Sequence, residues 1–315
     1  MASRKLEERV EQLRQLRSNP SSPEIDAILR KALVDRSNLI VAEAAKTIGE
    51  LRLSSWISQL LDSFSRLFVD PVKADPKCFG KTAIVRSLVQ LDYSESQPFI
   101  RGLRHVQMEP IMGGQEDCAG HLRANCALAL VQCTDLRRFE ILSYLVEALT
   151  DALDPVRIEA VRSMHQLAGD EATLLLRLKA RFGDRRPLIV GHVFDALLSL
   201  ERDRAVPFVA EYLDSSDDAL RDEAALALGS SRLARALEVL THRWQHSRGG
   251  FAEVLLRAIS SSRLPDAIDF LLNVLKTGTS QQATAALDAL KLHKDTPEIQ
   301  IKIEEAQIQR RQITL

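Results

Sequence analysis

A three-residue apolar pattern recurs along the chain and constrains its fold more than any other feature of the sequence. Ala160, Met164 and Leu167 are spaced i, i+4 and i+7, so they lie on one face of a helix. The pattern occurs seven more times, at Ala44/Ile48/Leu51, Ile84/Leu88/Leu91, Cys126/Leu130/Cys133, Val193/Leu197/Leu200, Ala224/Leu228/Ser231, Leu255/Ile259/Ser262 and Ala286/Leu290/His293. The steps between first members are 40, 42, 34, 33, 31, 31 and 31 residues. Such a period is typical of repeat proteins, in which each unit buries its apolar face only against its neighbours.

Partner helices with their own apolar stripes lie between these segments, for example at 139–153, 205–213 and 266–275. The repeating unit is therefore a helix–turn–helix. We predict an all-α fold, an α-solenoid (superhelix) of about eight helical hairpins over residues 21–295. The third member of the pattern becomes Ser, Ser and His in the last three copies, where we expect a polar terminal cap.

The segments that carry the pattern resemble HEAT repeats, especially the short repeats of phycobilisome-lyase-like bacterial proteins. Residues 154–167 (DPVRIEAVRSMHQL) and 218–229 (DALRDEAALALG) match the second-helix signature best, and 39–51 match it in part. The resemblance covers roughly residues 24–293. It implies that Arg157 and Arg221 pack against an acid of a neighbouring repeat, which is a structural role. It also permits a lyase-type chaperone for a tetrapyrrole, although no residue points to a pigment.

Two segments fall outside the array. Residues 1–20 carry Leu6, Val10, Leu13 and Leu16 at helical spacing, which predicts a capping helix or a short arm for a partner. We favour the cap. Residues 296–315 are expected to form a last helix or a tail.

Composition limits the cellular compartments in which we expect the protein. The net charge is −1, and the first residues carry acids where a signal peptide needs an apolar core. No window approaches 18 uninterrupted apolar residues, and four cysteines do not make a disulfide framework. We therefore expect a cytoplasmic protein without membrane contact, and a monomer.

Residues 80–82 read Gly-Lys-Thr, which is also how a phosphate-binding loop ends. That loop needs glycine five positions before Gly80, but Asp75 stands there and would repel an anion. It also needs a preceding strand, whereas residues 55–68 have helical spacing. We predict that the tripeptide begins the second helix of the second repeat.

The two longest inserts, about 70–82 and 107–121, account for the 40- and 42-residue steps. Consecutive repeats place their inter-helix turns on one edge, so we expect the inserts to be neighbours. Long loops on a regular array often carry binding function. Met108, Ile111 and Met112 would form an adaptable apolar patch if exposed. In the alternative, the insert folds over the first two repeats and seals their core.

Metal and catalytic sites find little support. Cys118 and His121 could form a metal set with Cys126 and Cys133, but the latter two occupy core positions of the repeat pattern. The HEAT scaffold also hosts a di-iron hydroxylase family with His-Glu ligand pairs, and none of the seven histidines here precedes a glutamate. We predict no cofactor, no metal and no catalytic residue.

The predicted function is that of a non-enzymatic scaffold or adaptor. It would bind another protein, which the sequence leaves unidentified, through a concave surface lined by the second helices and through the 107–121 insert. The candidate contact residues are Arg104, Met108, Ile111, Met112, Glu116, Asp117, His121, Arg123 and Arg162.

The alternative is a nucleic-acid-binding protein, similar to a glycosylase family of this architecture that excises alkylated bases. It would use a basic strip within residues 101–186. This alternative requires Arg104, Arg123, Arg162 and Arg181 to converge on one concave strip.

Overall fold

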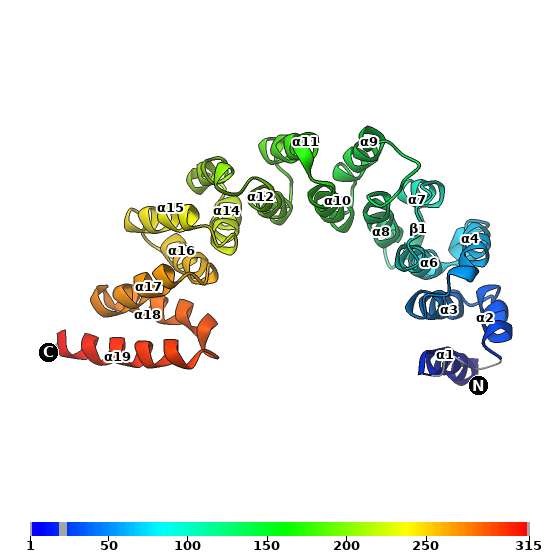
Figure 1. The fold of residues 1–315 in the computed structure, drawn as a ribbon, viewed down its shortest axis with the longest axis horizontal. Coiled ribbons are helices and arrows are strands. Elements are labelled where there is room, and N and C mark those ends of the chain that lie inside the picture. The colour runs from blue at the N-terminus through cyan, green and yellow to red at the C-terminus, as the bar shows by residue number, and fades with distance from the viewer. Residues whose placement is uncertain (1, 19–23, 314–315) are drawn as a thin grey trace. The chain divides into compact units, whose positions relative to one another are not determined.

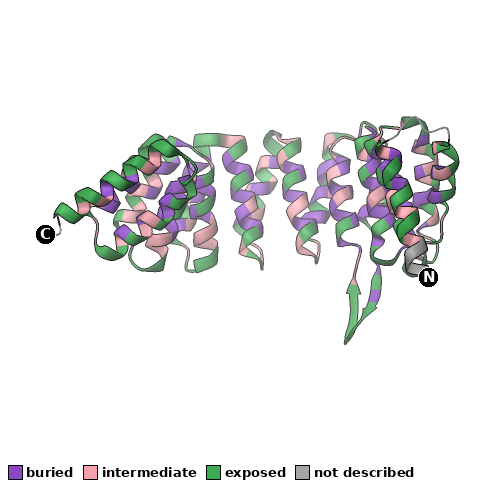
Figure 2. Ribbon diagram, turned by 90° about the horizontal axis from the view of Figure 1, so that it is seen from below, coloured by how far each residue is buried: buried purple, intermediate pink, exposed green. Residues whose placement is uncertain are grey.

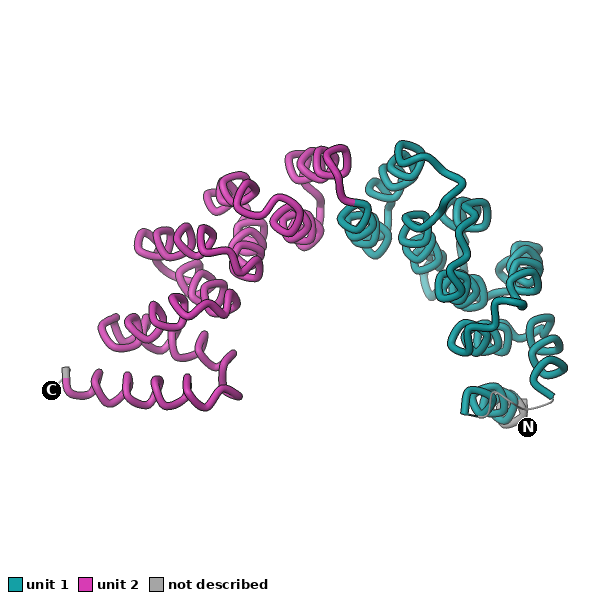
Figure 3. The backbone as a smooth tube through the Cα atoms, in the orientation of Figure 1, with its two compact units in different colours: residues 1–167 teal, residues 168–315 magenta. Residues whose placement is uncertain are grey.

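The computed structural model describes residues 2–18 and 24–313, which form helices apart from one β-hairpin (Figure 1). Eight helical hairpins follow one another in these ranges, so the predicted all-α repeat fold is confirmed. The chain divides into two compact units, unit 1 (Met1–Leu167) and unit 2 (Ala168–Leu315), coloured separately in Figure 3. A single array over residues 21–295 stays a prediction.

Unit 1 is built from two layers of helices. The first helices of its hairpins are α2 (Ile25–Leu33), α4 (Ile57–Arg66), α7 (Gln97–Leu103) and α9 (Arg138–Leu149). The second helices are α3 (Asn38–Glu50), α6 (Phe79–Gln90), α8 (Gly120–Leu130) and α10 (Asp154–Leu167), and they pack side by side. The remaining elements are α1 (Ala2–Ser18), η1 (Ser54–Trp56), α5 (Pro71–Ala74), η2 (Pro76–Cys78), β1 (Met108–Ile111) and β2 (Gly114–Asp117). In Figure 1 the second helices lie on the inner side of the bend of this unit.

Helix α1 packs against α3 at the start of unit 1. Leu13 and Leu16 are buried in this contact, as their helical spacing leads one to expect. Arg17 adds an ion pair to Glu50 on α3, with 2.8 Å between Nε and Oε2. The helix therefore covers the apolar side of α3 that has no earlier repeat to pack against.

Unit 2 repeats the two-layer plan. Its first helices are α11 (Gly169–Phe182), α13 (Val206–Ala210), α15 (Ala234–Gln245) and α17 (Pro265–Thr277). Its second helices are α12 (Pro187–Glu201), α14 (Asp218–Ser230), α16 (Gly250–Ser261) and α18 (Ser280–Leu290). The short turns are η3 (Arg202–Arg204), η4 (Glu211–Asp214) and η5 (Lys291–His293), and α19 (Pro297–Ile313) comes last. Proline at the first position of α12, α17 and α19 costs no hydrogen bond, because that N–H has no partner within a helix.

The core lies where the repeat pattern places it. The first and second members of all eight apolar triplets are at most 1% exposed. All sixteen lie on second helices, and each of these helices packs against a neighbouring second helix. Full burial of one Val, Leu or Ile side chain contributes about 1.5–3 kcal/mol, so these positions supply much of the stability of each unit. Figure 2 shows the buried residues gathered between the helices.

The polar cap expected at the end of the repeat pattern is wrong. Ser262 and His293 are both buried, and the Nε2 atom of His293 lies 3.1 Å from the carbonyl oxygen of Ser260. Helix α19 provides the cover instead, because it packs against α17 and buries Ile303 and Ala306. Ser262 and His293 therefore make hydrogen bonds inside the structure and do not face water, whereas Ser231 is half-buried.

The two arginines of the repeat signature form ion pairs within their own helices. Nη2 of Arg157 lies 2.7 Å from Oδ1 of Asp154, and Nη2 of Arg221 lies 2.8 Å from Oδ1 of Asp218. Each of these acids stands three residues earlier on the same helix, so both ion pairs lie within one repeat. Pairing with an acid of a neighbouring repeat stays a prediction. Arg221 reaches the next repeat through the ring of Phe251, which its guanidinium covers at 4.3 Å.

Candidate functional site

The 107–121 insert, expected to be a loop, forms an antiparallel hairpin of β1 and β2. Ile111 pairs with Gly114 and Met108 with Asp117, so a two-residue turn joins the strands. Gly113 in this turn has φ 91°, a conformation that favours glycine. Figure 2 shows the hairpin projecting beyond the ends of the neighbouring helices.

The hairpin presents its apolar side chains to solvent. Met112 at the turn is fully exposed, Ile111 is 50% exposed and Met108 is 45% exposed. Glu116 on β2 is exposed as well. Since these apolar side chains are exposed, they do not seal the core of the first two repeats.

The base of the hairpin, in contrast, is buried among polar groups. Gln107 is the central residue. Its Oε1 accepts hydrogen bonds from Nζ of Lys81 at 2.9 Å and from Sγ of Cys78 at 3.2 Å. Its Nε2 donates to Oε1 of Glu109 at 2.6 Å and to the carbonyl oxygen of Asp75 at 2.9 Å. One amide therefore ties the start of the hairpin to the 70–82 insert.

The two inserts lie side by side, as expected from their positions in consecutive repeats. The backbone N–H of Lys77 donates to Oε1 of Glu109 at 2.6 Å. Lys77 and Cys78 have φ of 59° and 56°, a left-handed conformation that costs a non-glycine residue about 1–2 kcal/mol. Contacts with the hairpin thus hold the 70–82 insert in a strained backbone shape.

Asp75 and Lys81 are both fully buried beneath the hairpin. The carboxylate of Asp75 accepts hydrogen bonds from the N–H groups of Gly80 at 2.7 Å and of Lys81 at 2.9 Å, and from Nδ2 of Asn38 at 2.9 Å. Nζ of Lys81 lies 3.4 Å from Oδ2 of Asp75 and 3.3 Å from the carbonyl oxygen of Leu67. The Gly-Lys-Thr tripeptide belongs to the first turns of α6, as predicted, and Asp75 satisfies the N–H groups there.

A second buried ion pair holds the end of the hairpin. Nη1 of Arg123 lies 2.8 Å from Oδ2 of Asp117, and its Nε lies 2.7 Å from Oδ2 of Asp151 on the far side. Burial acts to raise the pKa of Asp117, but hydrogen bonds from the N–H groups of Ala119 and Gln107, together with Arg123, lower it overall. Asp117 and Arg123 therefore support the hairpin from below. They are not available as contact residues for a partner.

Burial makes two thiols and one imidazole near this junction harder to charge. Burial raises the pKa of the Cys78 thiol to about 12, and burial followed by nearby acids also raises the pKa of Cys118. Burial lowers the pKa of His105, so this ring is neutral at neutral pH. Among the residues described, no group of three or more His, Cys, Asp or Glu could hold a metal ion.

A hollow of about 520 Å³ lies next to the hairpin base, between α3, α6 and the start of α8. Phe79 lines it with a ring that is 49% exposed. Lys77, Arg86 and His121 also line it, and within the described ranges no ion pair joins any of them to an acid. The predicted residue His121 thus lies at a concave site beside the hairpin.

The acids that line the hollow are neutralised by bases. Glu43 pairs with Arg17, and Glu50 pairs with Arg17 at 2.8 Å and with Lys46 at 3.8 Å. The charge left to act on a ligand is therefore basic. An aromatic ring beside two bases, Lys77 and Arg86, that have no acidic partner in the described ranges can bind an acidic segment that carries an apolar side chain.

The remaining predicted arginines lie away from this site. Nη2 of Arg104 lies 2.8 Å from Oε1 of Glu147, which places it between α7 and α9 of the first-helix layer. Arg162 on α10 pairs with Glu159, and Arg181 in unit 2 pairs with Glu211. Since Arg123 is buried as well, the basic strip required by nucleic-acid binding does not form within unit 1.

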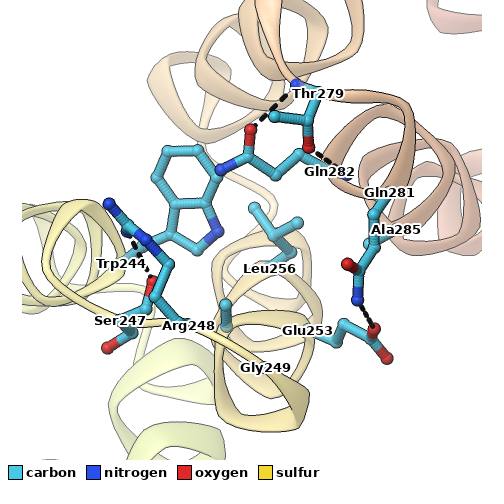
Figure 4. Close-up of a pocket in the computed structure, with 11 residues that line it drawn as sticks. Trp244, Ser247, Arg248, Gly249, Glu253, Leu256, Thr279, Gln281, Gln282 and Ala285 are labelled. Carbon is cyan, nitrogen blue, oxygen red and sulfur yellow. Dashed lines mark hydrogen bonds between the residues drawn. The ribbon is translucent and has the colours of Figure 1, made fainter.

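Unit 2 has a hollow of its own, of about 330 Å³, around Trp244 (Figure 4). Its polar lining is largely occupied: Gln282 and Thr279 form a capping box, and Gln281 donates to Glu253 at 3.4 Å. Nε1 of Trp244 is buried without a hydrogen-bond partner. A ligand could not reach this atom without displacing its neighbours, so we place the candidate site in unit 1.

Sequence reasoning missed the residues that line the hollow and anchor the hairpin. Lys77, Phe79 and Arg86 read as ordinary turn and helix residues, and no local signal marks them. Gln107 and Asp75 could have been noticed, since polar residues that flank a long insert often bond to the backbone.

A scan against protein-family models and a search of curated proteins both find no match. Among solved structures, human deoxyhypusine hydroxylase in complex with glycerol is 19% identical, covering 83% of this chain and 98% of that chain, with a TM-score of 0.31. An engineered protein solved by a structural-genomics consortium is 15% identical, covering 97% of this chain and 95% of that chain, with a TM-score of 0.33. Similarities this distant carry no functional information. The helical-repeat fold is what can be said of the chain, and function must come from the site.

Proposed function

We propose that unit 1 is a protein-binding module that takes an acidic, partly apolar segment of another protein. The hairpin tip would contact apolar side chains of the partner, and the hollow beside it would hold an acidic stretch. The observation that carries the proposal is the contrast within the hairpin. Its base is anchored by fully buried charged groups, while Ile111 and Met112 at its tip are exposed.

The anchoring supports a binding role on energetic grounds. Burying an ion pair such as Asp75–Lys81 rarely adds stability, because removing both charges from water is costly. An exposed apolar tip gains nothing for the isolated unit either. A rigid hairpin does lower the entropy cost of binding, since its backbone is already ordered before the partner arrives.

The charge of the hollow selects the partner. Lys77 and Arg86 attract carboxylates, and the exposed ring of Phe79 suits an apolar or aromatic neighbour. Binding should weaken as salt is added, because these bases are exposed and their attraction is screened. At 0.15 M salt the Debye length is about 8 Å, so only carboxylates that enter the hollow contribute.

A random peptide library displayed on phage tests this directly, with the whole chain as bait. We expect the selected peptides to combine Asp or Glu with Leu, Phe or Met. Ile111→Ser with Met112→Ser should remove the apolar preference. Lys77→Glu with Arg86→Glu should remove the acidic preference. These changes leave the buried anchors intact, whereas replacing the entire insert would strip Lys81 and Arg123 of their partners.

Phe139→Ser is the matched control, because Phe139 is 74% exposed on α9 and lies outside the site. Its selection should equal that of the unchanged chain. If the library yields no consensus, or if the tip and charge variants select the same peptides as the original, the proposal is wrong.

We further propose that the repeats are of the HEAT type and that the protein acts in the cytoplasm. The first rests on the match of residues 154–167 and 218–229 to that signature. The second is supported by the four cysteines, all of which are free thiols. In the described ranges, no helix has both the length and the apolarity needed to cross a membrane.

A further inference from the structure

Two histidines stand about one helical turn apart at the end of α15 in unit 2. His242 lies in the last turn of the helix, and His246 is the residue that follows the helix. Their i, i+4 spacing places both on one face, and their ring centroids are 4.7 Å apart. Both side chains are exposed, so an ion in solution can reach this histidine pair.

We propose that the histidine pair is a chelating site for a late first-row divalent cation, the class that includes Ni²⁺, Cu²⁺ and Zn²⁺. Imidazole nitrogen suits these ions, whereas Mg²⁺ and Ca²⁺ require oxygen ligands. Two histidines at i, i+4 on one helix face can bind a single ion together. The proposal departs from the absence of a metal that the sequence predicts, and it does not depend on the function proposed for unit 1.

A hydrogen bond fixes the protonation of His246 in the form that a metal needs. Its Nδ1 lies 2.9 Å from the carbonyl oxygen of His242. Because a carbonyl oxygen only accepts, Nδ1 carries the hydrogen and Nε2 keeps its lone pair. The carbonyl is available because the backbone N–H of His246 donates to Arg243 instead, where the helix ends. Metal-binding histidines are generally oriented by such a bond from the second ring nitrogen.

The separation of the two rings matches two adjacent coordination positions. A metal lies about 2.0–2.1 Å from a bound imidazole nitrogen, and therefore roughly 3.2 Å from the centre of that ring. The two ring centroids would then be roughly 4.5 Å apart for a right angle at the metal and roughly 5.2 Å apart for a tetrahedral angle. The observed 4.7 Å falls between these values. The exposed ring of His242 can turn to direct a nitrogen at the same ion.

The surroundings of the pair suit a cation that keeps open coordination positions. The last carbonyl groups of a helix carry partial negative charge, which stabilises a cation at the end of α15. Arg243 would repel the ion, but its Nη2 pairs with Oδ1 of Asp214 at 2.8 Å. His246 also lines a polar hollow of about 630 Å³, which has room for water. With two protein ligands, the remaining positions are filled by water, and the bound ion exchanges readily.

Isothermal titration calorimetry of Ni²⁺ with the full chain tests the proposal. The parent chain carries Cys118→Ser, because Cys118 is a half-buried thiol that could bind the ion and the other three cysteines are buried. His242→Gln and His246→Gln should each lower the affinity at least about tenfold, since a single imidazole loses the advantage of chelation. Circular dichroism checks that each variant is folded.

An exchange of two residues on α15 is the matched control. His242→Gln together with Gln245→His keeps the composition and the charge of the parent chain. It places the histidines at adjacent positions, 245 and 246, whose side chains do not face each other on a helix. This exchanged chain should bind Ni²⁺ as weakly as the single variants. A parent chain that binds Ni²⁺ no more tightly than the exchanged chain overturns the proposal.

Electron paramagnetic resonance of the chain loaded with one equivalent of Cu²⁺ tests the geometry independently. Splitting by ligand nitrogens should show two imidazoles on the copper in the parent chain and one in each single variant. One imidazole in the parent chain overturns the proposal. An affinity that falls for one single variant and stays unchanged for the other also overturns it, because a chelate requires both rings.

Discussion

Replacing Lys81 by methionine should destabilise unit 1 far more than its position in a Gly-Lys-Thr tripeptide suggests. Breaking a buried ion pair by removing one partner generally costs about 3–5 kcal/mol, because the other charge is left uncompensated. Asp75 would keep hydrogen bonds from two backbone N–H groups and from Asn38, which limits the loss. Methionine also preserves most of the buried aliphatic volume. We therefore expect Lys81→Met to lower the free energy of unfolding by about 3 kcal/mol.

Trp56 provides a local reporter for this loss. It is 5% exposed in unit 1, and the chain has one other tryptophan, Trp244 in unit 2. Repeat proteins can unfold unit by unit, so a global signal would mix two transitions. With Trp244→Phe as background, urea unfolding followed by fluorescence isolates unit 1. For a slope of about 2 kcal/mol per molar urea, the midpoint should fall by about 1.5 M.

A double-mutant cycle separates the ion pair from the loss of packing. Asp75→Asn alone should cost at least as much as Lys81→Met, because an amide cannot accept from the backbone N–H groups with both of its polar atoms. The double variant should be less destabilised than the sum of the two by about 1.5 kcal/mol or more. A midpoint shift below about 0.5 M for Lys81→Met, or a coupling energy near zero, would refute the reasoning.

Three further predictions concern unit 2. A Cβ on Gly229 would lie 2.1 Å from the carbonyl oxygen of Ala258, so Gly229→Ala should lower the free energy of unfolding by about 2 kcal/mol, measured by Trp244 fluorescence. Gly250→Ala is the control, because a Cβ there meets no atom within 4 Å and stability should not change. Equal effects of the two substitutions would contradict this. Trp244→Phe should lower the free energy of unfolding by less than about 1 kcal/mol, measured by circular dichroism. The change removes a buried N–H that has no partner, which offsets part of the packing lost against Phe270. A larger loss would contradict this. Burial lowers the pKa of His293 below 6.5, so the neutral ring contributes its full stability to unit 2 above pH 6.5, and this stability falls as the pH drops further. His293→Gln should make the free energy of unfolding less dependent on pH in that range. An unchanged pH profile would contradict the prediction.

The sequence predicts the repeat core well because that core depends on a local periodicity. Met164 and Leu197, for example, belong to apolar stripes with helical spacing. Each such stripe faces a neighbouring helix, so both residues are buried. The prediction for the third position of each apolar triplet is less accurate, because burial there depends on residues far away in the sequence. His293 looks like a surface residue in sequence, and its burial depends on Ser260, which lies 33 residues earlier on α16 and contacts its ring.

The hairpin could not be predicted from the residues that form it. Met108–Ile111 contains a proline and Gly114–Asp117 is polar, so neither strand has a strong β-propensity. The segment is extended because both of its ends are fixed. Gln107 bonds to Lys81, 26 residues earlier in the chain, and its N–H donates to Asp117 across the hairpin. Contacts of that range carry no local signature. The exposure of Ile111 could be anticipated, but its rigid support could not.

Asp75 links the misleading motif to the proposed function. A helix N-terminus attracts anions, and the start of α6 is no exception, because a carboxylate accepts its N–H groups. Here the anion is part of the chain, and the lysine that would otherwise meet a phosphate meets this carboxylate and the amide of Gln107. The same charges that make a nucleotide site impossible therefore fix the base of the hairpin. In the proposed function, the groups that bind a partner are the ones these charges hold in place, the exposed tip and the basic hollow beside it.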